Sequence, residues 1–504
     1  MATFISIGYV CVLAALTVLG LHRLHLVLLV LWHRRSAELP EDPRAWPTVT
    51  IQLPLYNEAT VVARLIDAVA AIDYPAERLE IQVLDDSCDE TREIVDERVR
   101  WHRGLGVPIE VVRRPERTGF KAGALAYGLE RCEGDLIAIF DADFVPNPDF
   151  LRRTVPHFED PQLGLVQGCW GHLNRDANLL TRVQALALDA HFRIEQAARS
   201  RTGRFFNFNG TAGIWRREAI DGAGGWAADT ITEDLDLSLR AQLIGWRFQF
   251  QEDVVAPAEL PEDLAAFRAQ QRRWTRGSGQ TARKLLGHVW RTPGVLFRAR
   301  VEATFQLLLN LAYPLLLLLV LATVPLVALG SPLLTLQWVL FGLATLSVTL
   351  FYVVSQRHRG WSGLAEGLAL TPVLFAYGIG LSLSNGLAYV QGLFGGEAAF
   401  VRTPKRGAIG AIARRYSVRP ELPFALAELG LAAYAFGGLG YGLFLGHPTA
   451  APFLALIGLG FLAVGGRTLF PAAPREMPSA PSELAVELAE ALDPETAPQP
   501  LLSS

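Results

Sequence analysis

The stretch LIAIFDADFVPNPD, residues 136–149, decides how the rest of this sequence is interpreted. A short apolar run bounded by polar residues is typical of a buried strand in a parallel sheet, and α/β proteins bind ligands at the carboxyl ends of such strands. Asp141 and Asp143 follow this run directly. Two carboxylates at a strand end can hold Mg²⁺ or Mn²⁺, whose other ligands are usually nucleotide phosphates. An ordinary turn is the alternative, because Pro146 and Pro148 follow.

The composition indicates a membrane protein with one large polar domain. Of the 504 residues, 51% are hydrophobic and 19% are charged. That is too apolar for an ordinary soluble enzyme, yet a long polar stretch separates the apolar segments. The formal net charge of −4 provides no basic field for nucleic acid, so we expect no nucleic-acid partner.

Residues 1–35 are expected to form an N-terminal transmembrane anchor. The chain is almost entirely apolar from 4 to 32, which is long enough to span a bilayer, except for a polar interruption around Arg23. We expect these polar side chains to face protein or water. Basic residues follow the apolar run, whereas no Lys or Arg precedes Arg23, so the positive-inside rule predicts that the next domain is cytoplasmic.

Residues 45–260 alternate strand-like and helix-like patterns. VTIQLPL, LEIQVLDD and LIAIFDAD are apolar runs of strand length, separated by helical patterns such as ATVVARLIDAVAAI. This order predicts βαβ units and a Rossmann-like, mostly parallel sheet with helices on both faces. The expected fold class is therefore an α/β cytosolic domain attached to an α-helical transmembrane bundle.

The remainder of the chain predicts further membrane elements. The basic, amphipathic stretch 261–300 suits helices at the membrane surface. Segments 301–360 and 422–471 are expected to form two transmembrane hairpins, which makes about five spans with the anchor. Segment 361–421 begins with an apolar run broken by Pro and Gly, and its basic flanks favour an interfacial or re-entrant element over a span. The Pro- and Glu-rich tail 472–504 is expected to be disordered.

Two further motifs deliver polar side chains to the edge of the sheet at which Asp141 lies. Asp85 and Asp86 follow the second strand, where either one could accept hydrogen bonds from a base or ribose. Lys121 opens a predicted helix and could meet a diphosphate together with the N-terminal amides of that helix. A solvated helix start is the plainer interpretation of Lys121 alone.

Thr232, Glu233 and Asp234 are predicted to lie at another helix N-terminus. A Thr cap followed by an acidic first turn is an ordinary stabilising choice there. Considered locally, the three residues therefore favour a capping role over a chemical one.

The motifs follow one another in a characteristic order: Asp85/Asp86, Asp141-x-Asp143, Thr232-Glu233-Asp234 and Gln270-x-x-Arg273-Trp274. This set, spread over roughly residues 48–290 and flanked by membrane spans, resembles the processive family 2 glycosyltransferases, which include cellulose, chitin and hyaluronan synthases. LPLYNE, IQVLDDS, FKAGAL, IFDADF, FNGTAG and QQRRW make the similarity closest to plant-type mannan and glucomannan synthases. Thr232 and Arg272 depart from that pattern, since those synthases more often have a hydrophobic residue and His at these places.

The resemblance implies a GT-A-like fold and inverting transfer of a hexose from a nucleotide sugar to a β-linked polysaccharide. It implies that Asp141 and Asp143 hold Mg²⁺ or Mn²⁺ on the diphosphate, and that Asp234 takes the proton from an acceptor hydroxyl. The other implied site residues are Glu233 and Thr232 beside that base; Asp85, Asp86 and Lys121 at the nucleotide sugar; and Gln270, Arg273, Trp274, Asn209 and Gly210 at the acceptor or pyrophosphate.

A loop near the C-terminal hairpin resembles the gating loop of cellulose synthases. In FVRTPK, residues 400–405, Phe400, Thr403 and Lys405 are expected to close over bound nucleotide, although Arg402 replaces the usual Val.

A basic interfacial helix with a membrane-facing Trp is the plainer interpretation of the QQRRW segment.

The expected partners are a nucleotide sugar (GDP-mannose, GDP-glucose or UDP-glucose), a glycan or lipid acceptor, and the lipid bilayer of the cell membrane. A single-transfer glycolipid synthase acting on ceramide or diacylglycerol is the alternative function, and a non-catalytic transporter or scaffold is a third. Asn310, Tyr313 and Asn385 could line a path for a glycan, or could simply hydrogen-bond between helices. For export of the product, the sequence leaves three alternatives open: a narrow path through this chain, help from a partner protein, or no translocation at all.

Overall fold

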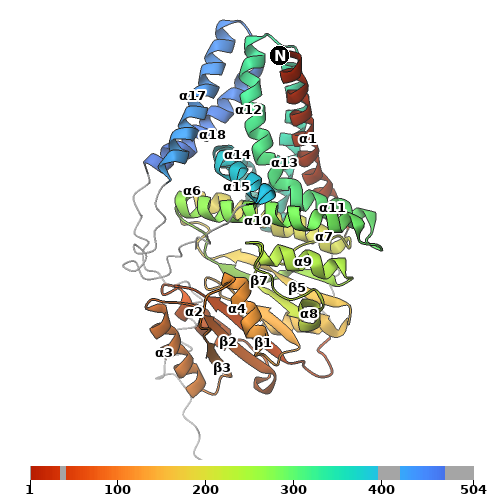
Figure 1. The fold of residues 1–504 in the computed structure, drawn as a ribbon, viewed down its shortest axis with the longest axis vertical. Coiled ribbons are helices and arrows are strands. Elements are labelled where there is room, and N and C mark those ends of the chain that lie inside the picture. The colour runs from red at the N-terminus through yellow and green to blue at the C-terminus, as the bar shows by residue number, and fades with distance from the viewer. Residues whose placement is uncertain (1, 34–40, 396–420, 471–504) are drawn as a thin grey trace, which may run out of the picture.

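The computed structural model describes residues 2–33, 41–395 and 421–470. A helical bundle carries the N-terminus at one end of the molecule, and an α/β domain forms the other end (Figure 1). The predicted gating-loop residues Phe400, Thr403 and Lys405 and the tail 472–504 lie outside the described residues.

A seven-stranded sheet within the described residues forms the centre of the α/β domain, in the order β3-β2-β1-β4-β6-β5-β7. Only β6 runs against its neighbours β4 and β5, so the prediction of a mostly parallel sheet is confirmed. The strands are β1 (Val49–Leu55), β2 (Leu79–Asp85), β3 (Ile109–Val112), β4 (Leu136–Ile139), β5 (Leu163–His172), β6 (Gly213–Arg216) and β7 (Arg247–Ala258).

The sheet is buried on both faces, which explains why its central strands are continuously apolar. In β4, Leu136 and Ala138 belong to one hydrophobic core, whereas Ile137 and Ile139 belong to the core on the opposite face. The alternation follows from the two-residue period of a strand. The first helices of the domain are α2 (Val62–Ala70), α3 (Thr91–Gly104), α4 (Phe120–Leu129) and α5 (Phe150–Thr154), with the 3₁₀ turns η1 (Ala76–Arg78) and η2 (Val155–Glu159).

A layer of helices separates the sheet from the bundle. Figure 1 shows α6, α10 and α11 running across the base of the bundle, with α7 and α9 beneath them. The layer comprises α6 (Leu179–Ala190), the π-helical turn η3 (His191–Gln196), α7 (Ala197–Arg201), α8 (Arg217–Gly222), α9 (Glu233–Leu243), α10 (Leu264–Arg291) and α11 (Phe297–Leu308).

Within the described residues, five helical segments are long and apolar enough to cross a membrane: Thr3–Trp32, Phe297–Ala328, Leu334–Gly380, Leu422–Phe444 and Pro448–Leu469. These segments make the chain a membrane protein. Their main helices are α1 (Ala2–Trp32), α12 (Ala312–Ala328), α13 (Leu334–Ser355), α17 (Leu422–Phe444) and α18 (Ala451–Leu469), joined in part by η4 (Leu309–Leu311), η5 (Gln356–Arg359) and η7 (Pro448–Ala450).

The anchor α1 packs along both α12 and α13. Helices α12 and α13 are joined by a short link, but they contact each other far less than each contacts α1. The polar interruption of α1 faces protein, since His22 and Arg23 pair with Glu302 and Glu195 respectively. The anchor is therefore packed into the bundle and paired with the helices beneath it.

Helices α14 (Gly360–Gly380) and α15 (Ser382–Phe394) lie near the base of the bundle, whereas α12 and α17 reach its far end (Figure 1). Pro372 lies inside α14 without ending it. The helices turn at Leu381, and α15 packs closely on α10 because Gly279 and Gly392 let the two backbones approach.

Candidate active site

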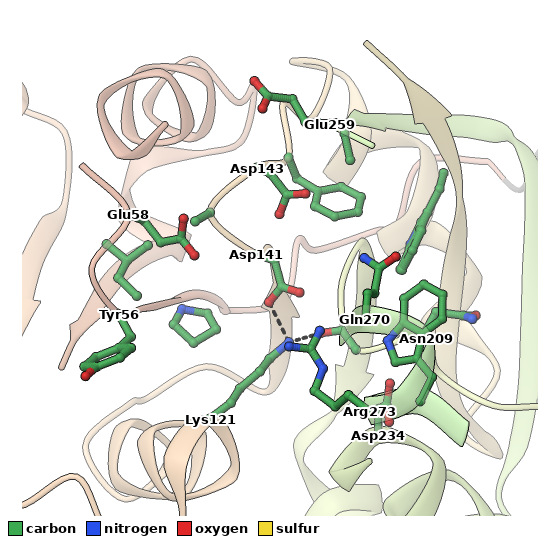
Figure 2. A pocket seen from close by; sticks show the side chains of 18 of the residues that line it. Tyr56, Glu58, Lys121, Asp141, Asp143, Asn209, Asp234, Glu259, Gln270 and Arg273 are labelled. Atoms are coloured by element: carbon green, nitrogen blue, oxygen red, sulfur yellow. Dashed lines mark hydrogen bonds and ion pairs between the residues drawn. The ribbon is translucent and has the colours of Figure 1, made fainter. Parts of the chain in front are cut away.

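A pocket opens between the carboxyl ends of β1 and β4 and the helix α10 (Figure 2). It brings together most of the residues singled out in the sequence, although they come from distant parts of the chain. The predicted residues that line it are Asp86, Lys121, Asp141, Asp143, Asn209, Gly210, Thr232, Glu233, Asp234, Gln270, Arg273 and Trp274.

Lys121 points into this pocket from the first turn of α4. Its Nζ donates to Oδ1 of Asp141 at 2.5 Å and to the backbone carbonyl of Gly210 at 2.8 Å. Burial alone would lower the pKa of Lys121, but the carboxylates of Asp141 and Glu233 outweigh that effect and raise it. The plainer expectation of a solvated helix start is therefore wrong, and Lys121 is a fixed cation of the site.

Asp141 is held from the backbone side by the loop that follows α7. Its amide N–H donates to Oγ1 of Thr211 at 2.9 Å. That loop is in turn anchored by Gln167 of β5, whose Nε2 donates to the carbonyls of Thr211 at 3.1 Å and Ala212 at 3.0 Å. The Asp141 carboxylate therefore projects from a buried, hydrogen-bonded backbone.

Gly210 lies between Lys121 and Asp234 and has a φ of +84°. A Cβ at this position would be 3.0 Å from Oδ2 of Asp234 and 3.4 Å from Nζ of Lys121. Only glycine combines this left-handed backbone with such a close approach. The FNGTAG stretch therefore forms the wall between Asp234 and Lys121.

Asp234 lies in the first turn of α9, with Oδ1 accepting from the amide of Leu235 at 2.7 Å. Burial, followed by the negative charge of Glu233, raises the pKa of Asp234 to about 7. The pKa of Glu233 is also raised, mainly by burial, against the attraction of Lys121. A carboxyl group with a pKa near neutrality suits proton transfer.

The expected capping role of Thr232 is wrong. Thr232 occupies the N-cap position of α9, but its side chain accepts no capping hydrogen bond. Its Oγ1 lies 3.3 Å from Oγ1 of Thr281 on α10, and a Cβ on Gly277 would be only 2.3 Å from its methyl group. Thr232 therefore joins α9 to α10.

The QQRRW segment lies within α10, where Gln270, Arg273 and Trp274 occupy positions i, i+3 and i+4 and share one face. That face lines the pocket. Arg272, which departs from the family pattern, points elsewhere: its guanidinium donates to Glu421 at 2.6 and 2.5 Å. One turn earlier, Arg268 donates to Glu428 of α17 at 2.5 and 2.9 Å. The helix thus joins the pocket to the bundle.

The paired aspartates after β2 have different surroundings. Asp85 is buried outside the pocket lining and accepts from Nε of Arg113 at 2.9 Å. Asp86 lines the pocket and accepts two hydrogen bonds from Arg114, at 2.8 and 2.6 Å. Of the two, Asp86 is the one that can meet a ligand.

Residues 47–277 match the model of the family described as "Glycosyltransferase like family 2". Residues 47–277 are a glycosyltransferase family 2 domain.

Relatives with known names agree with this assignment. The chain is 42% identical over 287 residues to "Glucomannan 4-beta-mannosyltransferase 1" of Oryza sativa subsp. japonica, covering 55% of each chain. It is 44% identical over 268 residues to "Glucomannan 4-beta-mannosyltransferase 2" of Arabidopsis thaliana, covering 52% of this chain and 50% of that one. The chain spans about half the length of these curated relatives.

A solved structure confirms the GT-A-like fold of the family 2 domain. "Mannosyltransferase PcManGT from Pyrobaculum calidifontis in complex with GDP-Man and Mn2+" superposes with a TM-score of 0.53 at 24% sequence identity. The match covers 73% of this chain and 98% of that chain.

Several residues at or beside the pocket were not among those predicted from the sequence. Tyr56 and Arg117 line the pocket, and the Arg117 guanidinium lies 3.4 Å from the centre of the Tyr56 ring, a stacked pair suited to a flat base. Tyr56 could have been found, because it follows β1 at the same edge as Asp141. His191 and Gln196, which both hydrogen-bond Asn209, carried no recognisable signal.

The pocket of the family 2 domain suits a divalent cation. Within the described residues its lining contains seven carboxylates but only three Lys or Arg side chains. No group of three or more His, Cys, Asp or Glu side chains in the described ranges converges as a complete metal site. Asp141 and Asp143 supply hard oxygen ligands, so they fit a cation that takes its remaining ligands from phosphates and water.

Proposed function

We propose that this protein is an inverting membrane glycosyltransferase that transfers mannose from GDP-mannose to a β-linked mannan or glucomannan chain. The observation that carries the proposal is the shared pocket of Asp141 and Asp234, which α10 covers at the base of the bundle. The names of the relatives support mannose as the sugar, and the GDP-Man bound to the solved mannosyltransferase supports GDP as its carrier.

In the proposed reaction, Asp234 accepts the proton of an acceptor hydroxyl, whose oxygen attacks the anomeric carbon of the donor. The bond from that carbon to the phosphate oxygen breaks on the opposite side, and its electron pair leaves with GDP. Lys121 and Arg273 lie in the pocket as cations that can stabilise the departing diphosphate. A divalent cation held by Asp141 and Asp143 would neutralise the same developing charge.

The acceptor is proposed to lie against α10. Gln270 and Asn209 offer amide groups to sugar hydroxyls, and the Trp274 ring offers an apolar face on which a sugar can stack. Asp86 with the Tyr56–Arg117 pair is proposed to bind the nucleoside. Phe400, Thr403 and Lys405 are proposed to close over it.

The membrane arrangement is also a proposal. The basic loops that flank the spans favour a cytoplasmic catalytic domain in the cell membrane. Helices α14 and α15, which lie near the base of the bundle, are proposed to be the re-entrant element of segment 361–421. Asn310, Tyr313 and Asn385 remain candidates for a glycan path, with or without an export partner.

The test uses the purified full-length protein in lipid nanodiscs with GDP-mannose, Mn²⁺ or Mg²⁺ and a mannan oligosaccharide. We expect GDP release and a product that β-mannanase digests, with loss of both after chelation of the metal. UDP-glucose, GDP-glucose and UDP-N-acetylglucosamine are tested in parallel. A product that is a single mannosylated lipid would overturn the polymer assignment, and no GDP release with any acceptor would overturn the function.

Asp234→Asn separates binding from chemistry in the same assay. The variant is expected to bind GDP normally and to lose at least about a hundredfold in kcat, since a general base commonly contributes that much. Unchanged turnover would remove Asp234 as the base.

A further inference from the structure

Two adjoining cavities lie outside the active site, beside the end of α1 that reaches the α/β domain. One, of about 420 Å³, lies between α1 and α11; the other, of about 430 Å³, lies next to it around residues 201–204. Arg204 and Arg298 line both. Figure 1 shows this end of α1 meeting α11 just above α7, at the base of the bundle.

The walls of this double cavity have contrasting chemistry. Val18 and Leu21 of α1, with Phe297, Val301 and Phe305 at the start of the α11–α12 segment, form an apolar wall. Phe297 is 72% exposed, an unusual environment for a large aromatic side chain unless lipid covers it. The other wall is mainly basic and contains Arg204, Arg298 and His25, with His33 in the second cavity. The buried pair of His22 and Glu302 also lines this wall.

The two guanidiniums lack a dedicated counterion. Arg298 makes no ion pair within the described ranges, and the carboxylate nearest to Arg204 is Glu302, at 3.9 Å. That carboxylate already accepts from Nε of Arg199 at 2.9 Å and lies 3.2 Å from Nε2 of His22. Burial lowers the pKa of Arg204, as does the positive charge of Arg298, against the attraction of Glu302. An anion between Arg204 and Arg298 would offset the repulsion between their two guanidinium groups.

We propose that this cavity binds one anionic phospholipid of the surrounding membrane. Arg204 and Arg298 hold its phosphate, and an acyl chain lies along the apolar wall between α1 and α11. Basic pockets between membrane helices at the headgroup level are typical lipid sites, and guanidinium groups suit phosphate. A headgroup with a net negative charge is required, because the cationic group of a zwitterionic lipid would be repelled by the same arginines.

The proposal is tested by native mass spectrometry of the delipidated full-length protein in neutral detergent. Phosphatidylglycerol and phosphatidylcholine with the same acyl chains are added in equal amounts. We expect one phosphatidylglycerol to be retained about tenfold more strongly than phosphatidylcholine, and the preference to disappear in the double variant Arg204→Gln/Arg298→Gln. Arg357→Gln is the matched control, since Arg357 is an exposed arginine in η5 that lines neither cavity.

Arg298→Glu controls for a folding defect. Arg298 is exposed, so reversing the charge of its side chain leaves the core intact. We expect this single change to reduce phosphatidylglycerol retention while thermal unfolding in detergent stays at the wild-type temperature. Equal retention by the wild type and the double variant would overturn the proposal, as would equal retention of the two lipids. Displacement of the lipid by millimolar glycerol phosphate would also overturn it, since the apolar wall would then contribute nothing.

Discussion

Nε2 of His191 lies 2.8 Å from Nδ2 of Asn209. His191, which lies outside the pocket, therefore holds the side-chain amide of Asn209, which lines it. Nδ1 of His191 lies 2.9 Å from the Glu195 carboxylate. The carboxylate therefore accepts a hydrogen bond from Nδ1–H, which leaves Nε2 as the acceptor for Asn209. Gln196 donates to Oδ1 of Asn209 at 2.6 Å, so both ends of the amide are fixed.

This contact predicts that His191 is a positioning residue for the acceptor. His191→Leu removes the acceptor of the Asn209 Nδ2 group and leaves the amide held only by Gln196. The loss of one hydrogen bond corresponds to about a tenfold fall in kcat/KM for the acceptor. The KM for GDP-mannose is expected to stay unchanged. His191→Gln, whose carbonyl can accept from Asn209, is expected to recover most of the activity. Equal loss in both variants would indicate a merely structural role.

The raised pKa of Asp234 predicts how activity depends on pH. Below a pKa of about 7 the carboxyl group is protonated and cannot act as a base, so kcat/KM should rise with pH and level off above neutrality. Because the charge of Glu233 contributes to the shift, Glu233→Gln should move the rising limb to lower pH. Burial is the larger cause, so the limb should not return to the pH of an ordinary aspartate. A pH profile of kcat/KM checks this, and an unmoved limb in Glu233→Gln would contradict it.

Gly210→Ala is expected to reduce kcat at least about tenfold, since the new methyl group must displace Asp234 and the left-handed backbone costs about 1–2 kcal/mol. Gly225→Ala is the matched control: Gly225 has a φ of +73° but no atom within 4 Å of an added Cβ. Both variants should lose similar stability in thermal unfolding. Only Gly210→Ala should lose turnover, and a comparable loss in Gly225→Ala would show that backbone strain alone is responsible.

The Arg268–Glu428 pair predicts strong coupling between α10 and α17. Both side chains are almost fully buried, at 3% and 0% exposed. Arg268→Leu leaves a buried carboxylate without its partner, which costs about 3–5 kcal/mol, whereas Arg268→Leu/Glu428→Leu should recover most of that loss. Thermal unfolding in detergent measures both. Additive losses in the double variant would contradict the coupling.

The local pattern of the sequence determined the architecture of the α/β domain. Apolar runs of strand length alternating with helical patterns predicted the parallel sheet, and the direction of each strand then predicted that Asp86 and Asp141 would lie at one edge. These inferences succeed because strand length, burial and polarity are properties of neighbouring residues. The same reasoning placed Lys121 and Asp234 in the first turns of helices.

Only the tertiary structure decided which partners those residues meet. Thr232 contacts Gly277 and Thr281 instead of capping its own helix, and Lys121 turns into the pocket because Asp141 lies there. His191 holds Asn209 from a π-helical turn that no local sequence pattern predicted. Each outcome depends on the distance between two backbone segments that are far apart in the sequence. That distance is set by packing and by glycines at the contact. Residue type and spacing along the chain do not encode it.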